Sequence, residues 1–224
     1  MSTDTFFRIS FIILLCSLTI IRLYFKYRAG LLHETVFPRT EKIHFIISRA
    51  ILGTPLLVAA LLYIFRPERQ TWMRIGLPPA VRALGVFTAA VSLLILVWIH
   101  RVLGRNFHTS IVIKKNHRLV TAGPYRLVRH PMYVTYLIFF ISMFLVSENV
   151  IIGLCGAGIM LILMTFRLRY EEALLVERFP NDYSHYQQTT PRFVPGIRSG
   201  RRRDENGSSL HKTAEEKPLE RNPR

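Results

Sequence analysis

Polar side chains that could do chemistry gather in two clusters in the second half of the chain. The first reads Gly123-Pro124-Tyr125-Arg126-Leu127-Val128-Arg129-His130-Pro131-Met132-Tyr133, and the second reads Arg167-Leu168-Arg169-Tyr170-Glu171-Glu172. Acids of the second cluster can pair with basic residues of the first. Adjacent acids on a helix point about 100° apart, so we expect only one of Glu171 and Glu172 to face a given pocket squarely. A structural interpretation stays open, in which Pro131 begins a helix and His130 and Tyr133 are interfacial residues.

Two apolar segments, residues 133–146 and 150–166, position these clusters. Only the short connection around Glu148 joins them, so the segments must be antiparallel neighbours. Tyr133 lies about 15 residues before Glu148 and Phe166 about 18 after it, and at about 1.5 Å per residue both return to nearly the same depth. The sequence therefore predicts that the two clusters meet at one end of a helical hairpin.

Composition sets the class of protein. Half of the 224 residues are hydrophobic and the mean hydropathy is +0.25, yet the net charge is +16. Five apolar segments approach the roughly 20 residues that cross a bilayer, namely residues 6–24, 43–65, 80–99, 133–146 and 150–166. Helices pair their own backbone groups in lipid. We predict an all-α, polytopic transmembrane bundle of about five spans, although one of the short last segments could instead be re-entrant or interfacial.

The distribution of lysine and arginine predicts the orientation. Residues 22–42 carry five, residues 66–82 four, residues 101–129 seven, residues 147–149 none, and the chain from residue 167 onward twelve. The positive-inside rule places the C-terminus and the predicted site in the cytoplasm of a multi-pass integral membrane protein. Residues 66–82 fit worst, because their four charges fall on the outer side. The sequence does not distinguish a bacterial inner membrane from the endoplasmic reticulum.

Several other functions are not favoured. Gly156-Ala157-Gly158 looks like part of a nucleotide-binding loop, but no strand precedes it, so Gly153 and Ala157 are better interpreted as a small-residue pair for helix packing. Cys16 and Cys155 lie in apolar segments and form no metal motif, so we expect no metal site. The basic tail fits topology or lipid headgroups, and we expect no nucleic-acid partner.

The residues Leu119-Val120-Thr121-Ala122 and the whole first cluster resemble the signature of the isoprenylcysteine carboxyl methyltransferase family, which is related to membrane phospholipid N-methyltransferases. Leu103-Gly104-Arg105-Asn106-Phe107 is similar to the approach to that signature. Further similar residues downstream are Tyr170-Glu171-Glu172, Phe179, Tyr183, Tyr186 and Pro191-Arg192-Phe193-Val194-Pro195. The resemblance covers residues 100–197, and it departs from the family at Val134, where a glycine is common.

The resemblance implies S-adenosylmethionine as methyl donor and a lipidic or prenylated acceptor that arrives through the bilayer. It implies cofactor contacts for His130, Pro131, Tyr133, Glu171 and Glu172, with Tyr125 and Leu127 as neighbours in the pocket. Tyrosine faces suit the sulfonium, carboxylates the ammonium and ribose hydroxyls, and His130 beside a helix N-terminus the carboxylate.

The predicted catalytic residues are Arg129, Arg167 and Glu171. Arg129, Arg167 or Arg169 could orient an acceptor carboxylate by bidentate pairing. An amine acceptor would need a carboxylate or histidine to take a proton.

Carboxyl O-methylation of an isoprenylcysteine-like acceptor is thus the leading prediction. Phospholipid N-methylation and a non-catalytic membrane scaffold stay open as alternatives. A sterol reductase is disfavoured, because Val134-Thr135 replaces the Gly-Glu that usually follows in its related signature.

The chain divides into three predicted regions. Residues 1–99 form a three-span membrane region, residues 100–197 the methyltransferase core with the last two spans, and residues 198–224 a disordered basic tail.

Overall fold

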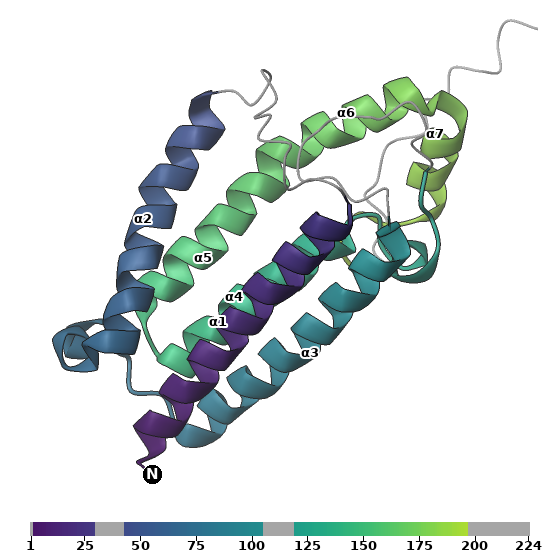
Figure 1. Ribbon diagram of the computed structural model, residues 1–224. Coiled ribbons are helices and arrows are strands. Elements are labelled where there is room, and N and C mark those ends of the chain that lie inside the picture. The colour runs from purple at the N-terminus through teal and green to yellow at the C-terminus, as the bar shows by residue number, and fades with distance from the viewer. Residues whose placement is uncertain (1, 30–42, 105–118, 197–224) are drawn as a thin grey trace, which may run out of the picture.

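The computed structural model describes residues 2–29, 43–104 and 119–196, and the regular elements in these ranges are all helices (Figure 1). In chain order they are α1 (Thr3–Arg28), α2 (Ile43–Phe65), η1 (Pro67–Met73), α3 (Pro79–Leu103), η3 (Gly123–Arg126), α4 (Pro131–Ser147), α5 (Val150–Ile162), η4 (Leu163–Arg167), α6 (Leu168–Arg178) and α7 (Pro180–Thr189). The all-α prediction is therefore confirmed. The predicted tail, residues 198–224, lies outside the described residues.

Local sequence explains where the helices around the site begin. Pro131 and Pro180 occupy the first turns of α4 and α7, where the missing proline N–H costs nothing. The side chain of Asn149 caps α5 by accepting a hydrogen bond from the backbone N–H of Ile152 at 3.1 Å. Helix α5 runs without a break through the π-helix η4 into α6, so the apolar segment and the second polar cluster share one rod.

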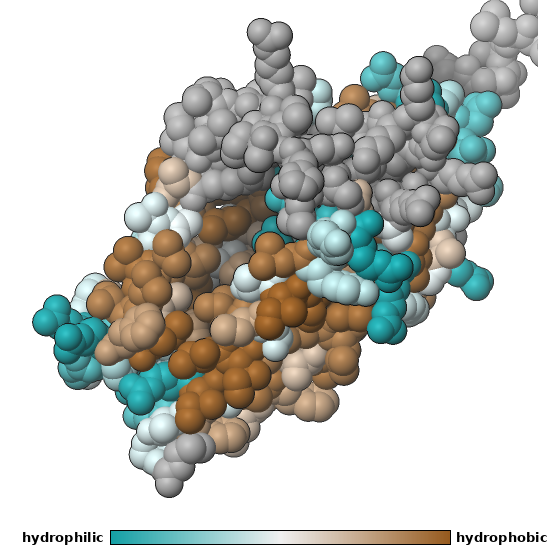
Figure 2. Space-filling model, viewed as in Figure 1, coloured by the Kyte–Doolittle hydropathy of each residue, from teal (hydrophilic) through white to brown (hydrophobic). Residues whose placement is uncertain are grey.

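Three helices of the described chain are long and apolar enough to cross a membrane, by length and composition. They are α1, α3 and the continuous rod Val150–Arg178, while Ala50–Phe65 and Pro131–Ser147 are shorter apolar helices. Figure 2 shows apolar residues over the middle of the visible face and hydrophilic residues toward its ends. The predicted count of five spans stays a prediction.

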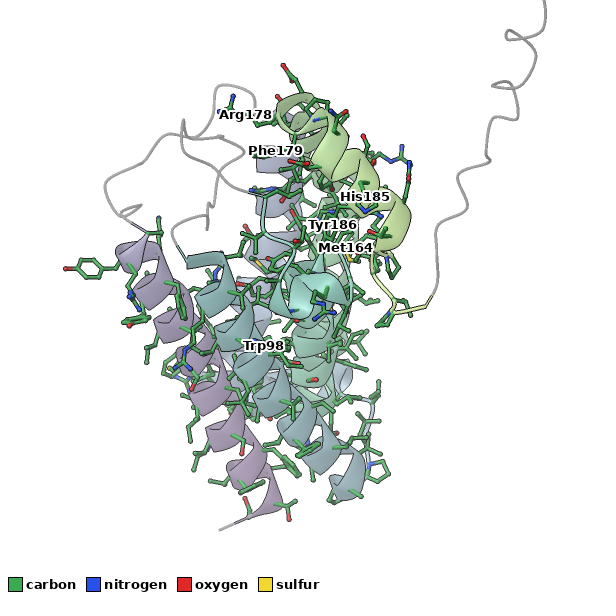
Figure 3. The ribbon with its side chains drawn as sticks, turned by 90° about the vertical axis from the view of Figure 1, so that its right-hand side faces the viewer. Trp98, Met164, Arg178, Phe179, His185 and Tyr186 are labelled. Carbon is green, nitrogen blue, oxygen red and sulfur yellow. The ribbon has the colours of Figure 1, made fainter. Side chains whose placement is uncertain are left out.

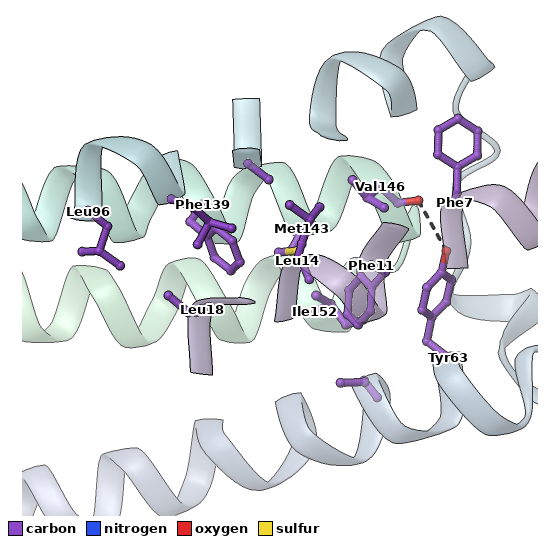
Figure 4. Packing of buried hydrophobic residues seen from close by; sticks show 14 residues of the cluster. Phe7, Phe11, Leu14, Leu18, Tyr63, Leu96, Phe139, Met143, Val146 and Ile152 are labelled. Carbon is purple, nitrogen blue, oxygen red and sulfur yellow. Dashed lines mark hydrogen bonds between the residues drawn. The ribbon is translucent and has the colours of Figure 1, made fainter. Parts of the chain in front are cut away.

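Helix α4 lies at the centre of the bundle and contacts α1, α3 and α5, whereas α2 packs mainly against α5. The hydrophobic core contains side chains from each of the helices α1 to α5 (Figure 4). In it the rings of Phe11 and Tyr63 meet edge to face with centroids 4.9 Å apart. The Tyr63 hydroxyl lies 3.5 Å from the carbonyl oxygen of Val146, at the hairpin end of α4.

Glycines let α4 and α5 approach closely. A Cβ atom added at Gly153 would lie 2.8 Å from the ring of Phe144, and one at Gly156 would lie 2.8 Å from the ring of Phe140. The predicted packing role of Gly153 is confirmed, and Gly156 is the second glycine in this contact. The two-residue connection, Glu148 and Asn149, and these glycines hold α4 and α5 as the antiparallel hairpin that the sequence predicts.

Four charged side chains tie the bundle together at the hairpin turn. This apex cluster consists of Asp4, Arg74, Arg82 and Glu148. Arg82 Nη1 lies 2.6 Å from oxygens of both Asp4 and Glu148, and Arg74 Nη2 lies 3.0 Å from Asp4 and 3.2 Å from Glu148. Arg82 is only 4% exposed and its guanidinium stacks 4.0 Å from the ring centroid of Phe7. The start of α1, the start of α3 and the hairpin turn are thereby fixed to one another.

Candidate functional site

The two polar clusters meet at the end of the hairpin opposite the apex cluster, as the sequence predicts. Nε2 of His130 lies 2.9 Å from Oε1 of Glu172, and the Tyr133 hydroxyl donates to Oε2 of Glu171 at 3.0 Å. Helix α7 also lies at this end, where it packs against α6, and Arg178 and Phe179 form the corner between the two helices (Figure 3). The site is therefore built from the start of α4, from α6 and from α7.

Glu172 is surrounded by donors from three segments. Its Oε1 accepts from Nε and Nη2 of Arg129 at 3.3 and 3.2 Å, from Nε2 of His130, and from Nε of Arg192 at 3.2 Å. Its Oε2 accepts from Nη2 of Arg192. The residue is 8% exposed. Because two guanidinium groups and an imidazole N–H surround it, this carboxylate is held ionised, and most of its accepting capacity is used within the chain.

Arg129 links the first cluster to the end of α7. Besides Glu172, its guanidinium donates through Nη1 to the carbonyl oxygens of Gln187 at 3.0 Å and Thr190 at 2.6 Å. Its backbone N–H donates to the carbonyl of Pro191 at 2.9 Å. The side chain is 8% exposed. The prediction that Arg129 orients an acceptor carboxylate therefore conflicts with a guanidinium already engaged by Glu172 and two carbonyls.

The segment after α7 closes over the same place. The backbone N–H of His130 donates to the carbonyl oxygen of Arg192 at 3.2 Å, next to the bond between Arg129 and Pro191. The Tyr186 hydroxyl donates to the carbonyl oxygen of Tyr125. These hydrogen bonds therefore hold residues 125–130 and residues 186–192 against each other, next to the acids of α6.

Glu171 differs from its neighbour. It is half-buried, and in the described part of the chain its carboxylate accepts one side-chain hydrogen bond, from Tyr133. Its Oε1 is available to a ligand. The prediction that the two acids face differently is confirmed, and Glu171 is the acid with open capacity.

Tyr125 lies close to this open carboxylate. Burial raises the pKa of the Tyr125 hydroxyl above its ordinary value, and the nearby Glu171 charge raises it further. The hydroxyl therefore stays neutral in any physiological medium. Tyr125, Tyr133 and Glu171 together present an electron-rich surface suited to a cation.

His130 and Pro131 lie where the first cluster meets α4. The His130 ring is engaged with Glu172, so its Nε2 does not face a ligand carboxylate as the sequence interpretation required. Helix α4 begins without a side-chain cap. Backbone N–H groups in the first turn of a helix have no intrahelical partner, and such groups can bind an anion.

Two predicted residues lie at the margin of the site. Leu127 is 56% exposed, unlike the buried Arg129 and His130. Arg167 is half-buried and ends the π-helix η4, four residues before Glu171 on the same rod. π-Helical turns inside α-helices are frequently found at functional sites. Within the described residues no group of acidic, histidine and cysteine side chains could hold a metal ion.

Arg192, Tyr183 and Tyr186 belong to the site but were not predicted as site residues. Their sequence signal is the proline-bounded motif Pro191-Arg192-Phe193-Val194-Pro195 and the two tyrosines before it, in a polar stretch. Residue order alone does not place that stretch against the start of α4.

Comparison with known proteins places the shared region over this site. The family model of phospholipid methyltransferases matches residues 80–182. Protein-S-isoprenylcysteine O-methyltransferase B of Arabidopsis thaliana is 34% identical over 96 residues, which are 42% of this chain and 49% of that protein. The Schizosaccharomyces pombe protein-S-isoprenylcysteine O-methyltransferase is 32% identical over 96 residues, 42% of this chain and 41% of that one.

A relative that is named for metal resistance matches at a similar identity and over a similar length. The cobalt-zinc-cadmium resistance protein CzcN of Cupriavidus metallidurans is 32% identical over 84 residues, 38% of each chain. The chain thus spans about half the length, or less, of these curated relatives.

Among solved structures, the eukaryotic intramembrane Ras methyltransferase ICMT (isoprenylcysteine carboxyl methyltransferase) superimposes with a TM-score of 0.53. The match covers 84% of this chain and 68% of that one at 18% identity, so it concerns the fold. Residues 80–182 therefore carry a region similar to phospholipid methyltransferases, and about 96 residues of the chain are similar to protein-S-isoprenylcysteine O-methyltransferases.

Proposed function

We propose that this protein is a membrane methyltransferase that uses S-adenosylmethionine and acts on a lipidic acceptor. The observation that carries the proposal is the open carboxylate of Glu171 beside Tyr133 and Tyr125, at the edge of an apolar bundle. Similarity to phospholipid methyltransferases and to protein-S-isoprenylcysteine O-methyltransferases supports methyl transfer as the reaction.

The residues at the site fit the methyl donor. S-adenosylmethionine carries a sulfonium, an ammonium and a carboxylate, and it supplies an electrophilic methyl group when bound. Glu171 would hold the ammonium through its open oxygen, and the tyrosine rings would face the sulfonium. The uncapped N–H groups at the start of α4 would hold the carboxylate.

Glu172 and Arg129 have a different role in this proposal. Their mutual pairing, together with Arg192 and the carbonyls of Gln187 and Thr190, keeps α6 and α7 in place around the donor. Both are positioning residues, and Glu171 is the acid that contacts the ligand.

The acceptor we favour is the carboxylate of an isoprenylcysteine-like molecule. A carboxylate is nucleophilic at neutral pH, so the protein needs to supply positioning and exclusion of water but no general base. Arg167, half-buried at the boundary between the apolar rod and Glu171, would orient that carboxylate.

Phospholipid N-methylation is the second candidate, because the family model that matches residues 80–182 is that of phospholipid methyltransferases. An amine acceptor must lose a proton, and Glu171 is the group with a free oxygen to take it. The two candidates share the donor site and differ only in the acceptor.

Binding of S-adenosylmethionine to the full chain in detergent tests the proposal. The intact protein should bind, and Glu171→Gln should weaken binding at least tenfold while the protein stays folded, because the charge for the ammonium is lost. Glu177→Gln, an exposed acid on the same helix, is the matched control and should bind normally. Absence of binding by the intact protein would exclude the proposed function.

Two acceptors then separate the candidates. With labelled donor, an S-farnesylcysteine analogue that has a free carboxylate should be methylated, and its methyl ester should not. Labelling of phosphatidylethanolamine vesicles instead would establish the second candidate.

A further inference from the structure

Tyr183 is buried without a hydrogen-bond partner. Its side chain is 1% exposed, and its hydroxyl bonds to no atom in the described ranges. Other tyrosine hydroxyls differ: Tyr133 donates to Glu171, Tyr186 to the carbonyl of Tyr125, and Tyr63 approaches the carbonyl of Val146. Leaving a buried hydroxyl unpaired costs about 1–3 kcal/mol, so the position calls for an explanation.

The surroundings of this hydroxyl include the ring of Tyr186 and the charges of the acids of α6. Tyr183 packs edge to face on Tyr186, with ring centroids 6.0 Å apart. Burial first, and then the charges of Glu172 and Glu171, raise the pKa of its hydroxyl, which places the group within electrostatic reach of both carboxylates. It is a neutral donor that remains protonated over any working pH.

The position of this hydroxyl is fixed rather than adaptable. Arg129 holds the end of α7 through the carbonyls of Gln187 and Thr190, and Tyr186 holds its middle through Tyr125. The backbone N–H of Tyr183 donates a hydrogen bond to the carbonyl oxygen of Phe179 at 2.9 Å, in the first turn of α7. A donor held this firmly beside Glu171 and Glu172 is prepared for an acceptor that is not part of the folded chain.

We propose that Tyr183 is a further binding residue, whose hydroxyl donates a hydrogen bond to an acceptor atom of the methyl donor. The inference rests on the proposed function, and it adds a residue of α7 to a binding site otherwise formed by η3, α4 and α6. Pairing with the ligand would remove the penalty of the unpaired hydroxyl, and that gain would appear as affinity.

Tyr183→Phe in the full chain tests the proposal. The protein should keep its thermal unfolding midpoint or gain slightly, because no hydrogen bond within the chain is lost. Its Kd for both S-adenosylmethionine and S-adenosylhomocysteine should rise about tenfold, and the KM for the donor should rise with kcat nearly unchanged. Tyr63→Phe, the same change at the apex end of the bundle, should leave both Kd values unchanged.

Three outcomes would overturn the proposal. Equal donor affinity in Tyr183→Phe and the intact protein would mean that the hydroxyl does not contact the methyl donor. A fall in the unfolding midpoint of several degrees would mean that it has a structural partner. Donor binding by neither protein would remove the proposed function as well, whereas binding by both, at equal strength, removes only the role of Tyr183.

Discussion

The neighbours Glu171 and Glu172 have the same side chain and opposite surroundings. Glu172 is enclosed by Arg129, His130 and Arg192, whereas Glu171 accepts a single bond from Tyr133. The sequence predicts that the two point apart, because successive helix positions differ by about 100°. It does not tell which acid faces inward, because that depends on Arg192, which lies 20 residues further along the chain.

Glu172→Ala should lower the free energy of unfolding by about 3–5 kcal/mol. The change leaves the buried Arg129 guanidinium without its carboxylate, and an uncompensated buried charge is strongly destabilising. Thermal or denaturant unfolding in detergent measures the loss.

Glu171→Ala is the control for this loss and should change stability by less than about 1 kcal/mol, because it removes one half-buried hydrogen bond. Equal stability losses in the two variants would contradict the division of roles between these acids.

At the scale of elements, the hairpin is the part that the sequence predicts best. The short connection at Glu148 and the two apolar segments determine an antiparallel pair, and the structure begins α4 at Pro131 and α5 at Val150. The π-helix η4 has no comparable signal, because Leu163–Arg167 contains neither proline nor glycine. Helix α7 and its docking on residues 125–130 were also beyond prediction, since they depend on tertiary contacts.

Gly153→Ala and Gly156→Ala should each destabilise the protein by about 1–3 kcal/mol. In both cases the new methyl group would lie 2.8 Å from a phenylalanine ring of α4, so the helices must separate or the ring must move. The measurement is the thermal unfolding midpoint in detergent.

Gly158→Ala is the matched control on the same helix. Its added methyl group would meet only Leu52, at an ordinary 3.4 Å. Stability should therefore stay within about 0.5 kcal/mol of the intact protein. A loss at Gly158 equal to that at Gly156 would indicate a general effect of glycine replacement instead of packing against α4.

At the scale of the whole molecule, charges separate into two ends with different tasks. The end with α6 and α7 carries the candidate site, and the other end carries the apex cluster. Residues 66–82 fit the positive-inside rule poorly when their charges are only counted. In the structure Arg74 and Arg82 are paired with Asp4 and Glu148, so two of these four charges are neutralised. Because these two arginines are paired with acids, the positive charges of residues 66–82 argue less strongly against the predicted orientation, with the site in the cytoplasm.

Arg82→Met should lower the free energy of unfolding by about 3–5 kcal/mol, because Glu148 would remain buried with fewer cationic partners. Binding of S-adenosylmethionine by the protein that stays folded should be unchanged, since the apex cluster lies at the other end of the bundle. Arg66→Ala, which removes an exposed pair with Glu68 at 3.9 Å, should cost less than about 1 kcal/mol.

The backbone pairing of residues 129–130 with residues 191–192 affects the order in which the protein is made. Translation delivers Arg129 and His130 first, and their partners Pro191 and Arg192 follow about 60 residues later, which at about 5–20 residues per second is a delay of several seconds. The apolar helices and the hairpin turn are complete by then, but the site is not. A nascent chain interrupted between Ile162 and Pro191 therefore has helices α1–α5 without the completed candidate site.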